Sequence, residues 1–337
     1  MKAYVIGTQE GISSLTLTER PDPVAGPGEA VLKVRLACLN NRDIQILEGR
    51  YGAKKAQDRI PLAEGLGEVV SVGDGVTQVA VGDRAVCPHF VAWHDGPFDM
   101  SYFGKDLGTF TDGWAAEYIK VPAGALVKVP ASLSDEAAAP LAAATLTAWH
   151  AVSVIGEVKA GDLVLALGTG GVSMAALQIA KANGAFVAIT SSSDEKLEEA
   201  RKMGADYTVN YRTSPDWAAE LLKQTGGRGA DIIAETGGQH TLPMSINAAA
   251  CNARVVLIGV GSADGPLPNY GGIIGKNLVI KGIASGSRGM LVNLLRAMEA
   301  NDFAPVVDKT FAFDEMAQAL DYLKSGNHQG KVLVKVS

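Results

Sequence analysis

Hydrophobic and polar positions alternate over short stretches in the first 130 residues of the chain. Strand-like segments with this alternation are separated by Gly and Pro, as in MKAYVIG at the start, EAVLKVRLACL at 29–39, GEVVSVG at 67–73 and AAEYIKVP at 115–122. A period of two with such breaks is typical of antiparallel β-strands. We therefore predict a mainly β region over residues 1–130.

From residue 131 onward the pattern changes to apolar strands that alternate with helices. The strand-like runs lie at 162–168, 185–190, 206–211, 231–238, 253–259 and 277–283. Such alternation indicates βαβ units and a doubly wound parallel sheet over residues 131–284. The last stretch, 285–337, contains two helix-like segments and a closing strand at 330–336. Because the parallel sheet already has enough strands, we expect this stretch to return to the first domain.

The composition narrows the class of protein. The 337 residues are 47% hydrophobic and 20% charged, with a net charge of −6, which argues against a nucleic-acid surface. The start lacks the features of a secretory signal, and no apolar run reaches membrane-spanning length. The three cysteines, Cys38, Cys87 and Cys251, are far apart and form no C-x-x-C pair, which favours a reducing compartment. We expect a cytoplasmic α/β protein of two domains with no membrane partner.

A glycine-rich turn between a strand and a helix is the first candidate site. In LALGTGGVSMAALQIAKANGA (165–185) an apolar strand ends at Gly168 and a helix with one apolar face follows. The backbone N–H groups of such a turn, together with the helix N-terminus, can bind a dinucleotide pyrophosphate. Ser173 replaces the usual third glycine, so a turn without a ligand is the alternative, but the βα unit that follows favours binding. The predicted cofactor-binding residues of this turn are Gly168, Thr169, Gly170, Gly171 and Val172.

Three serines occupy the place where an NAD-selective chain normally has an acidic residue. Ser191 stands at the end of the second strand, about 20 residues after the glycines, where a carboxylate would hold the ribose 2′-hydroxyl. Ser192-x-x-Glu195 matches a capping box, so one serine is expected only to cap the next helix. A serine can donate to a 2′-phosphate, which a carboxylate would repel. We therefore predict NADPH, bound by Ser191, Ser192, Lys196 and Tyr211, with Arg212 near the phosphate.

Several motifs along the whole chain resemble one superfamily. They are LNNRDIQILEGRY (39–51), GEVVSVGDGV with VGDRAV (67–86), GWAAEY (113–118), LTAWHA (146–151), GTGGVS (168–173), EKLEEARKMGADYTVNY (195–211), RVVLIG (254–259) and GKVLV (330–334). Together they resemble the medium-chain dehydrogenase/reductase superfamily, and within it the zinc-independent quinone-oxidoreductase and enoyl-reductase-like branch. The resemblance implies a GroES-like domain over 1–130 and 285–337, with a Rossmann domain over 131–284 between them.

The zinc positions of that superfamily carry other residues in this chain. The positions of the catalytic Cys, the Gly-His-Glu and the second Cys look like Asn40, Ala63 followed by Glu64, and Ala143, and residues 92–113 contain no cysteine for a structural zinc lobe. Zinc needs three or four N, S or O ligands at one point. Cys87 and His89, with His94 nearby, form a second possible ligand set, for which packing is the favoured role. We therefore predict no metal.

Without zinc, charge that develops on a substrate oxygen must be met by hydrogen-bond donors. The resemblance points to Tyr51 as a catalytic donor, with packing at a loop as the alternative. Asn40 is the second catalytic candidate, although it can equally cap the helix that follows it. By the same resemblance Thr147, Gly259 and Val260 lie beside the nicotinamide, and Lys331 is a further cofactor-binding residue.

These residues predict an NADPH-dependent oxidoreductase that transfers a hydride to a quinone or an α,β-unsaturated carbonyl without zinc. The alternative enzyme is a zinc-independent alcohol dehydrogenase or ketone reductase. A nucleotide-binding protein without turnover, serving as a redox sensor or partner-binding subunit, is the alternative from another class. The resemblance also implies a homodimer in which the strand at 277–283 pairs across a two-fold axis.

Overall fold

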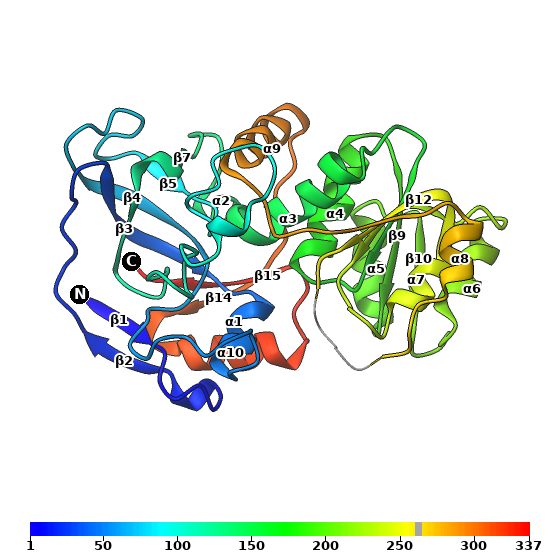
Figure 1. Ribbon diagram of the computed structural model, residues 1–337, viewed down its shortest axis with the longest axis horizontal. Coiled ribbons are helices and arrows are strands. Elements are labelled where there is room, and N and C mark those ends of the chain that lie inside the picture. Colours follow the sequence, from blue (N-terminus) through cyan, green and yellow to red (C-terminus); the bar gives the residue numbers. More distant parts are fainter. Residues whose placement is uncertain (260–264) are drawn as a thin grey trace. The chain divides into compact units, whose positions relative to one another are not determined.

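The computed structural model describes residues 1–259 and 265–337 and divides the chain into two compact units (Figure 1). The first unit comprises residues 1–146, 286–300 and 307–337, and the second comprises residues 147–285 and 301–306. The chain thus leaves the first unit once and returns to it near its end. We call these the GroES-like unit and the Rossmann unit and describe each by itself.

The GroES-like unit is built on a sheet with strand order β14-β15-β3-β4-β5-β7, in which β6 also pairs with β3. All of its pairs are antiparallel except β14 with β15. A separate antiparallel pair is formed by β1 and β2. The strands are β1 (Lys2–Val5), β2 (Thr16–Glu19), β3 (Glu29–Cys38), β4 (Glu64–Val72), β5 (Arg84–Val86), β6 (Tyr118–Pro122), β7 (Val127–Lys128), β14 (Val307–Ala312) and β15 (Lys331–Lys335).

The C-terminal strand completes this sheet. Strand β15 lies beside β3, with Leu333 opposite Cys38 in register (Figure 1). The helices of the unit are α1 (Asn41–Leu47), α2 (Asp135–Ala138), α9 (Arg288–Asn301) and α10 (Met316–Ser325). Because α1 follows directly on β3, the residues between them lie next to the first residues of β15. This junction is where the candidate site is built.

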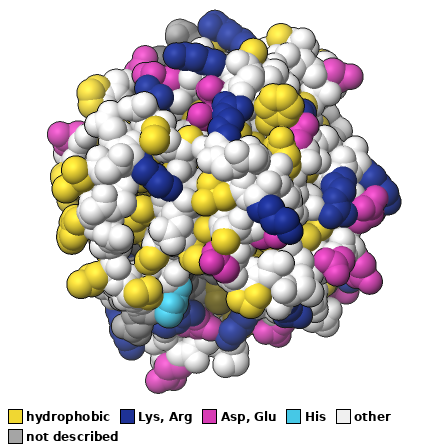
Figure 2. All heavy atoms as spheres, turned by 90° about the vertical axis from the view of Figure 1, so that its right-hand side faces the viewer, with side chains coloured by type: hydrophobic (Ala, Val, Ile, Leu, Met, Phe, Trp, Pro, Cys, Tyr) yellow, Lys and Arg dark blue, Asp and Glu magenta, His cyan; other side chains and the backbone are white. Residues whose placement is uncertain are grey.

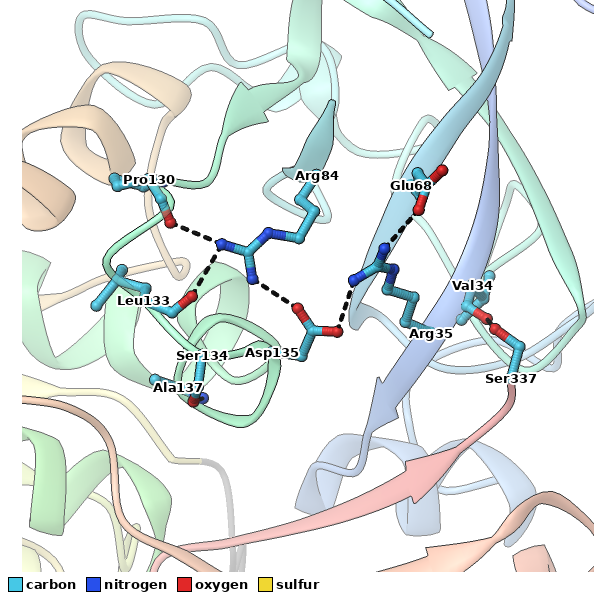
Figure 3. Close-up of polar contacts among 10 residues, drawn as sticks. All are labelled: Val34, Arg35, Glu68, Arg84, Pro130, Leu133, Ser134, Asp135, Ala137 and Ser337. Carbon is cyan, nitrogen blue, oxygen red and sulfur yellow. Dashed lines mark hydrogen bonds and ion pairs between the residues drawn. The ribbon is translucent and has the colours of Figure 1, made fainter. Parts of the chain in front are cut away.

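Two arginines tie α2 to the sheet. Arg84 Nη1 donates to Asp135 Oδ1 at 2.6 Å, and Arg35 Nη1 donates to the other oxygen of the same carboxylate at 3.0 Å (Figure 3). Arg35 also pairs with Glu68 of β4, and Arg84 Nη2 donates to two backbone carbonyls in the segment before α2. Burial alone would raise the pKa of Asp135, but the two guanidinium groups outweigh it and hold the pKa below its ordinary value.

The Rossmann unit contains a six-stranded parallel sheet of order β10-β9-β8-β11-β12-β13. Its strands are β8 (Leu163–Leu167), β9 (Phe186–Ser191), β10 (Tyr207–Asn210), β11 (Ala230–Glu235), β12 (Ala249–Leu257) and β13 (Val279–Gly282). Its helices are α4 (Gly171–Ala182), α5 (Asp194–Lys202), α6 (Trp217–Gln224), α7 (Leu242–Ala248) and α8 (Tyr270–Gly275). The strand order reverses between β8 and β11, and in doubly wound sheets ligands bind at that point, beyond the carboxyl ends of the strands.

The segment between β7 and β8 is helical over most of its length. It contains α2, α3 (Leu146–Trp149) and two π-helical stretches, Leu141–Thr145 and His150–Ile155. Among the described residues, Asp135–Ile155 is the one helical segment with the length and hydropathy of a membrane span, although no apolar run was expected to reach that length. Because 78% of its apolar window is buried within the protein, we interpret it as a core helix.

The predicted α/β fold class is confirmed, and each strand expected for the parallel sheet is present. The first boundary between the units differs from the expected position at 130/131, because residues 131–146 cluster with the GroES-like unit. The ion pairs of Asp135 with Arg35 and Arg84 fix that segment to β3 and β5. The sequence pattern did not indicate on which unit this segment packs.

Candidate active site

A buried ammonium group lies at the junction of β3, α1, β4 and β15. Lys331, the first residue of β15, is 4% exposed. Its Nζ donates to the Leu39 carbonyl at 2.8 Å, to Asn40 Oδ1 at 2.6 Å and to Glu64 Oε2 at 3.0 Å. These contacts use all three donors of an ammonium group. We call Asn40, Glu64 and Lys331 the Lys331 cluster.

Glu64 supplies the negative charge of this cluster. Its side chain is fully buried, and its Oε1 accepts the backbone N–H groups of Ala143 at 2.7 Å and Ala144 at 3.2 Å. Burial alone would lower the pKa of Lys331, but the charge of Glu64 and its hydrogen bond to the ammonium outweigh burial and raise that pKa above its ordinary value. The pair therefore exists as ammonium and carboxylate, with their remaining bonding capacity satisfied by neighbours.

The backbone before Glu64 is strained. Leu62 has a φ of 74°, a conformation that is a rare outlier for a bulky side chain. The Leu62 carbonyl accepts the N–H of Trp114 at 3.0 Å, and the Trp114 ring is fully buried next to Gly65. A Cβ at residue 65 would lie 2.8 Å from that ring, so the glycine permits this packing. The surrounding core thus fixes the direction in which the Glu64 side chain enters the cluster.

Asn40 takes part in the cluster through both ends of its amide. Its Nδ2 donates to Glu64 Oε2 at 2.9 Å and to the Cys38 carbonyl at 3.4 Å, while its Oδ1 accepts from Lys331. Asn40 also occupies the N-cap position of α1, where its backbone N–H donates to Asp43 Oδ2 at 2.8 Å. The structure therefore directs the side chain of Asn40 toward Glu64 and Lys331 in the protein interior.

The Lys331 cluster does not have the donor set of a zinc site. The Lys331 ammonium pairs with the Glu64 carboxylate, the one acidic group of the cluster. Residue 143, next to it, is alanine and offers no ligand. Burial raises the pKa of the adjacent Cys38 thiol well above its ordinary value, so no thiolate is present there. Within residues 1–259 and 265–337, no group of three or more His, Cys, Asp and Glu side chains converges as metal ligands. The residues present therefore do not fit zinc.

The second possible metal set contains a buried thiol that keeps its proton, next to a neutral histidine. Cys87 and His89 are both buried. Burial raises the pKa of Cys87 to about 12, and burial together with the charge of Arg42 lowers the pKa of His89 well below its ordinary value. A thiol that keeps its proton is a poor ligand. Cys87 belongs to the hydrophobic core of the unit, in agreement with the packing role that the sequence favoured.

Tyr51 lies after α1, with its ring between the core and two cations. The ring packs against the hydrophobic core and is partly buried. The Arg42 guanidinium carbon lies 5.1 Å from the ring centroid, and Lys55 Nζ lies 5.7 Å from it. Lys55 Nζ also lies 5.3 Å from the centroid of the Phe110 ring. Tyr51 therefore shares its surroundings with cations that the sequence analysis did not single out.

The glycine turn of the Rossmann unit has the open geometry that a bound phosphate requires. Gly168 has a φ of +78°, and a Cβ at Gly168 or Gly170 would meet nothing within 4 Å. Helix α4 begins at Gly171, directly before Val172, and no side chain caps its first N–H groups. Ser173, in place of the third glycine, is 1% exposed and donates to the Leu167 carbonyl at 2.6 Å. A small hydroxyl thus replaces that glycine without filling the turn.

The serines after β9 have different roles from those expected. Ser193, not Ser192, is the N-cap of α5, and its Oγ accepts the Lys196 N–H at 3.3 Å. The capping box assigned to Ser192 and Glu195 was therefore wrong by one residue, because α5 begins at Asp194. Ser191 is buried at the end of β9, and its Oγ accepts the Ser193 N–H at 3.3 Å.

The remaining expected cofactor residues are distributed over the Rossmann unit. Tyr211 is 42% exposed, and its N–H donates to the Ser191 carbonyl at 3.0 Å. Thr147 is buried at the start of the unit. A Cβ at Gly259 would lie 2.0 Å from the Thr236 carbonyl oxygen, so only glycine fits where β12 ends beside β11. Val260 lies outside the described residues.

A buried carboxylate at the end of β11 was missed by the sequence analysis. Glu235 is 1% exposed, and its Oε1 accepts the N–H groups of Gly237 at 2.8 Å and Gly238 at 3.1 Å. Its other oxygen accepts from the Ser245 hydroxyl. An acidic residue within the apolar run DIIAETGG was the available signal. Glu235 fixes the loop that follows β11, at the same edge of the sheet as Gly168 and Gly259.

Comparisons with known proteins agree with both units. The family model described as alcohol dehydrogenase GroES-like domain matches residues 26–131, and the one described as zinc-binding dehydrogenase matches residues 171–300. A zinc-type alcohol dehydrogenase-like protein of Schizosaccharomyces pombe is 43% identical over 317 residues, which are 92% of this chain and 91% of that protein.

Two further similar proteins carry names that describe an activity. An acryloyl-coenzyme A reductase of Metallosphaera sedula is 31% identical over 349 residues, which cover 99% of each chain. A solved structure described as an NAD-dependent alcohol dehydrogenase is 33% identical, covers 100% of both chains and superimposes with a TM-score of 0.90.

Proposed function

This chain belongs to the zinc-type alcohol dehydrogenase-like family of medium-chain NAD(P)-dependent oxidoreductases, and we propose that it reduces conjugated acceptors with NADPH and without zinc. The acceptor is a quinone or an α,β-unsaturated carbonyl. The observation that supports this proposal is the Lys331 ammonium, which bonds to Glu64, one of the positions that the resemblance matches to the zinc site of the family.

The choice of acceptor follows from the charge that reduction creates. Hydride addition to a ketone leaves an alkoxide, a strong base that needs a Lewis acid or an immediate proton. Hydride addition to the β-carbon of an enone leaves an enolate, and a quinone leaves a phenolate, which are much weaker bases. Hydrogen-bond donors of the protein suffice for them. The Lys331 ammonium is no substitute for a Lewis acid because Glu64 already neutralises its charge.

The residues then have the following roles in the proposed reaction. NAD(P)H supplies the hydride when it is bound. Gly168 and Gly170 leave room for its pyrophosphate, and the N–H groups at the start of α4 donate to it. Thr147 and Gly259 line the nicotinamide pocket. Tyr51, or water, gives the proton that completes reduction, and Asn40 positions the backbone at the start of α1 by holding Glu64 and Lys331.

NADPH is proposed over NADH because Ser191 stands where an acidic residue would reject a 2′-phosphate. Lys196 in the first turn of α5 adds a positive charge to that region, as does Arg212 after β10. Asp194, in the same first turn, is an acidic group near this region: its Oδ1 accepts from Asn210 Nδ2 at 2.7 Å, and Asn210 lies opposite Ser191 in register. The similar structure described as NAD-dependent makes NADH the cofactor to compare directly.

The names of the relatives favour one further candidate. The protein of S. pombe is described as alcohol dehydrogenase-like, and the solved structure is described as an alcohol dehydrogenase. The acryloyl-coenzyme A reductase, by contrast, is named for an enone-type substrate. A zinc-independent ketone reductase is therefore the second candidate function. A nucleotide-binding protein without turnover is the third, and it has no specific observation in its favour.

A matched pair of acceptors separates these functions. Oxidation of NADPH and NADH is followed at 340 nm with 4-phenylbut-3-en-2-one, with the saturated ketone 4-phenylbutan-2-one and with a naphthoquinone, before and after treatment with a strong chelator. We expect the enone and the quinone to be reduced, the saturated ketone to be reduced far more slowly, and no effect of the chelator. Comparable rates with the saturated ketone would establish the second candidate, and cofactor binding without turnover the third. Activity that is lost on chelation and restored by Zn²⁺ would overturn the zinc-free proposal.

A further inference from the structure

Arg42 carries hydrogen-bond donors that the described part of the protein does not satisfy. It lies in the first turn of α1, two residues after Asn40, and its side chain is 12% exposed. Its Nη2 donates to Asp106 Oδ2 at 3.3 Å. Its Nε and Nη1 are shielded from solvent and have no hydrogen-bond partner among the described residues. Buried donors are nearly always paired in native proteins. The Nε and Nη1 donors of the planar Arg42 guanidinium therefore need an acceptor, which a ligand or water can supply.

Lys55 brings a second cation to the same place. Its ammonium and the Arg42 guanidinium both lie over the Tyr51 ring, and the Phe110 ring flanks Lys55. One Lys55 donor goes to the Ala53 carbonyl at 2.8 Å, which leaves two further donors on the ammonium group. Burial lowers the pKa of Lys55, Asp106 opposes that shift, and the charge of Arg42 lowers it further. The two cations repel each other, and Asp106, which pairs with Arg42 and also raises the pKa of Lys55, offsets part of that repulsion. A second anion near both cations would offset more of it.

The carboxylates nearby are each engaged through one oxygen. Asp106 Oδ2 accepts from the Thr109 hydroxyl as well as from Arg42, whereas Asp106 Oδ1 is buried without a partner among the described residues. Asp43, whose burial raises its pKa to about 6, accepts the backbone N–H of Asn40 at Oδ2, and its Oδ1 also has no partner among those residues. Glu64 and Lys331 neutralise each other. His89 is neutral, because burial and then the charge of Arg42 lower its pKa, and its Nδ1 is buried without a partner among the described residues.

We infer that Arg42 and Lys55 bind a carboxylate of the substrate, so that the natural acceptor is an acidic compound. The planar Arg42 fork matches the two oxygens of a carboxylate. The Tyr51 ring and the half-exposed Phe110 ring suit an aromatic or otherwise planar body attached to it. This inference rests on the proposed function, since it names the class of acceptor that the same unit binds.

The first test compares an acid with its ester. The enone acid 4-(3-oxobut-1-enyl)benzoate and its methyl ester have the same reacting bond and differ in one remote charge. We expect the wild type to prefer the acid by roughly 10- to 100-fold in kcat/KM, the range of a charge-assisted hydrogen bond. Arg42→Gln and Lys55→Gln should each bring the ratio of acid to ester toward one. Arg50→Gln is the matched control, because it removes an exposed cation one residue from Tyr51, and the ratio should persist.

A binding measurement keeps the inference separate from the proposed function. Benzoate and benzyl alcohol are titrated calorimetrically into wild type, Arg42→Lys and Lys55→Gln. We expect benzoate to bind the wild type, to bind each variant at least several-fold more weakly, and to bind less well as the pH rises through the Lys55 pKa. The alcohol should bind in none of them.

The two tests distinguish failure of the acid-binding inference from failure of the proposed reductase function. Reduction of acid and ester with equal kcat/KM, or benzoate binding that Arg42→Lys and Lys55→Gln leave unchanged, would overturn the inference and leave the proposed function standing. Benzoate binding that depends on both cations, with no reduction of either enone, would support the acid site and overturn the reductase. A crystal structure with only water at Arg42 Nε and Nη1 in the presence of saturating benzoate would also overturn the acid site.

Discussion

Lys331 provides the counter-charge of a buried carboxylate. Two backbone N–H groups hold Glu64 in place, and an unpaired carboxylate there would be costly to bury. The ammonium of Lys331 neutralises that charge and also bonds to Asn40, so three residues from distant parts of the chain satisfy one another. The cluster is therefore a structural element as much as a chemical one.

Removal of one partner should reveal this dependence. Lys331→Met keeps the length of the side chain but leaves Glu64 buried without a counter-charge, which should destabilise the protein by about 3–5 kcal/mol. Adding Glu64→Gln removes the orphaned charge and should restore at least half of that loss. Urea unfolding at pH 7 measures both effects. If the free energy of unfolding of Lys331→Met lies within about 1 kcal/mol of the wild-type value, which is on the order of one surface ion pair, then water or another group neutralises Glu64.

Ser191 is the residue on which the cofactor proposal depends. If its hydroxyl donates to a 2′-phosphate, wild type should prefer NADPH over NADH by roughly tenfold or more in kcat/KM, and added salt should weaken the preference. Ser191→Asp places a carboxylate against the phosphate and offers an acceptor to the ribose hydroxyl of NADH, so the preference should invert. Steady-state kinetics with both cofactors measures the ratio.

Ser193→Ala is the control for this substitution. Since Ser193 caps α5, the loss of its hydroxyl should lower stability by about 1 kcal/mol and leave the cofactor ratio unchanged. If wild type uses both cofactors equally and Ser191→Asp does not move the ratio, Ser191 only supports the Ser193 N–H at the start of α5.

At the scale of elements, the Asp135 carboxylate joins α2 to β3 and β5 (Figure 3). Asp135→Asn removes the charge that both guanidinium groups share and should destabilise the GroES-like unit by about 1–2 kcal/mol, allowing for its partial exposure. Since the folded-state pKa of Asp135 is lowered, its contribution is fully present above the unfolded value of about 4 and is lost as the pH falls through the folded value.

Unfolding at several pH values tests this argument. The difference in stability between wild type and Asp135→Asn should be largest near pH 7 and should shrink on acidification below about pH 4. Glu136→Gln changes the neighbouring exposed carboxylate in the same first turn of α2, so it controls for the helix dipole. A loss of stability that is equal in both variants, or independent of pH, would assign the effect to the helix start.

The sequence was sufficient to predict the strands and helices of the two units, but it did not predict the side-chain contacts between them. Strand and helix periodicity predicted the six parallel strands and the return of β15, because each pattern is local. The Lys331 cluster joins residues 267 positions apart, and no local pattern contains that information. The N-cap of α5 was misplaced by one residue because Ser192 and Ser193 are both good caps, and only the backbone decides between them. The orphaned donors of Arg42 become visible only when every neighbour is known.

At the scale of the whole molecule, the chemistry of the proposed reaction is divided between the units. The Rossmann unit supplies the glycine turn and Ser191, and the GroES-like unit supplies Tyr51, the Lys331 cluster and the two cations above the Tyr51 ring. Each group of residues is positioned within its own unit. The first unit is completed only by the last strand of the chain, so loss of β15 would remove Lys331 along with an interior strand of the sheet.

The free edge of the Rossmann sheet leads to the last prediction. Strand β13 ends the sheet and pairs with β12 on one side only, among the strands that the structure describes. Val279 on β13 is 51% exposed, and Tyr270 and Ile274 of α8 are 71% and 78% exposed. The face of this unit seen in Figure 2 shows hydrophobic side chains interspersed with charged ones. An apolar edge strand tends to associate unless it is covered.

We propose that two copies of the chain pair along β13 across a two-fold axis, as the family resemblance implies. Light scattering with size-exclusion chromatography at micromolar concentration should then give a dimer for the wild type. Val279→Lys places like charges near the axis and should yield monomer, whereas Phe186→Lys, at an exposed position of the interior strand β9, should remain dimeric. A monomeric wild type, or a dimer that survives Val279→Lys, would mean that Lys281 on the edge is enough to keep β13 unpaired.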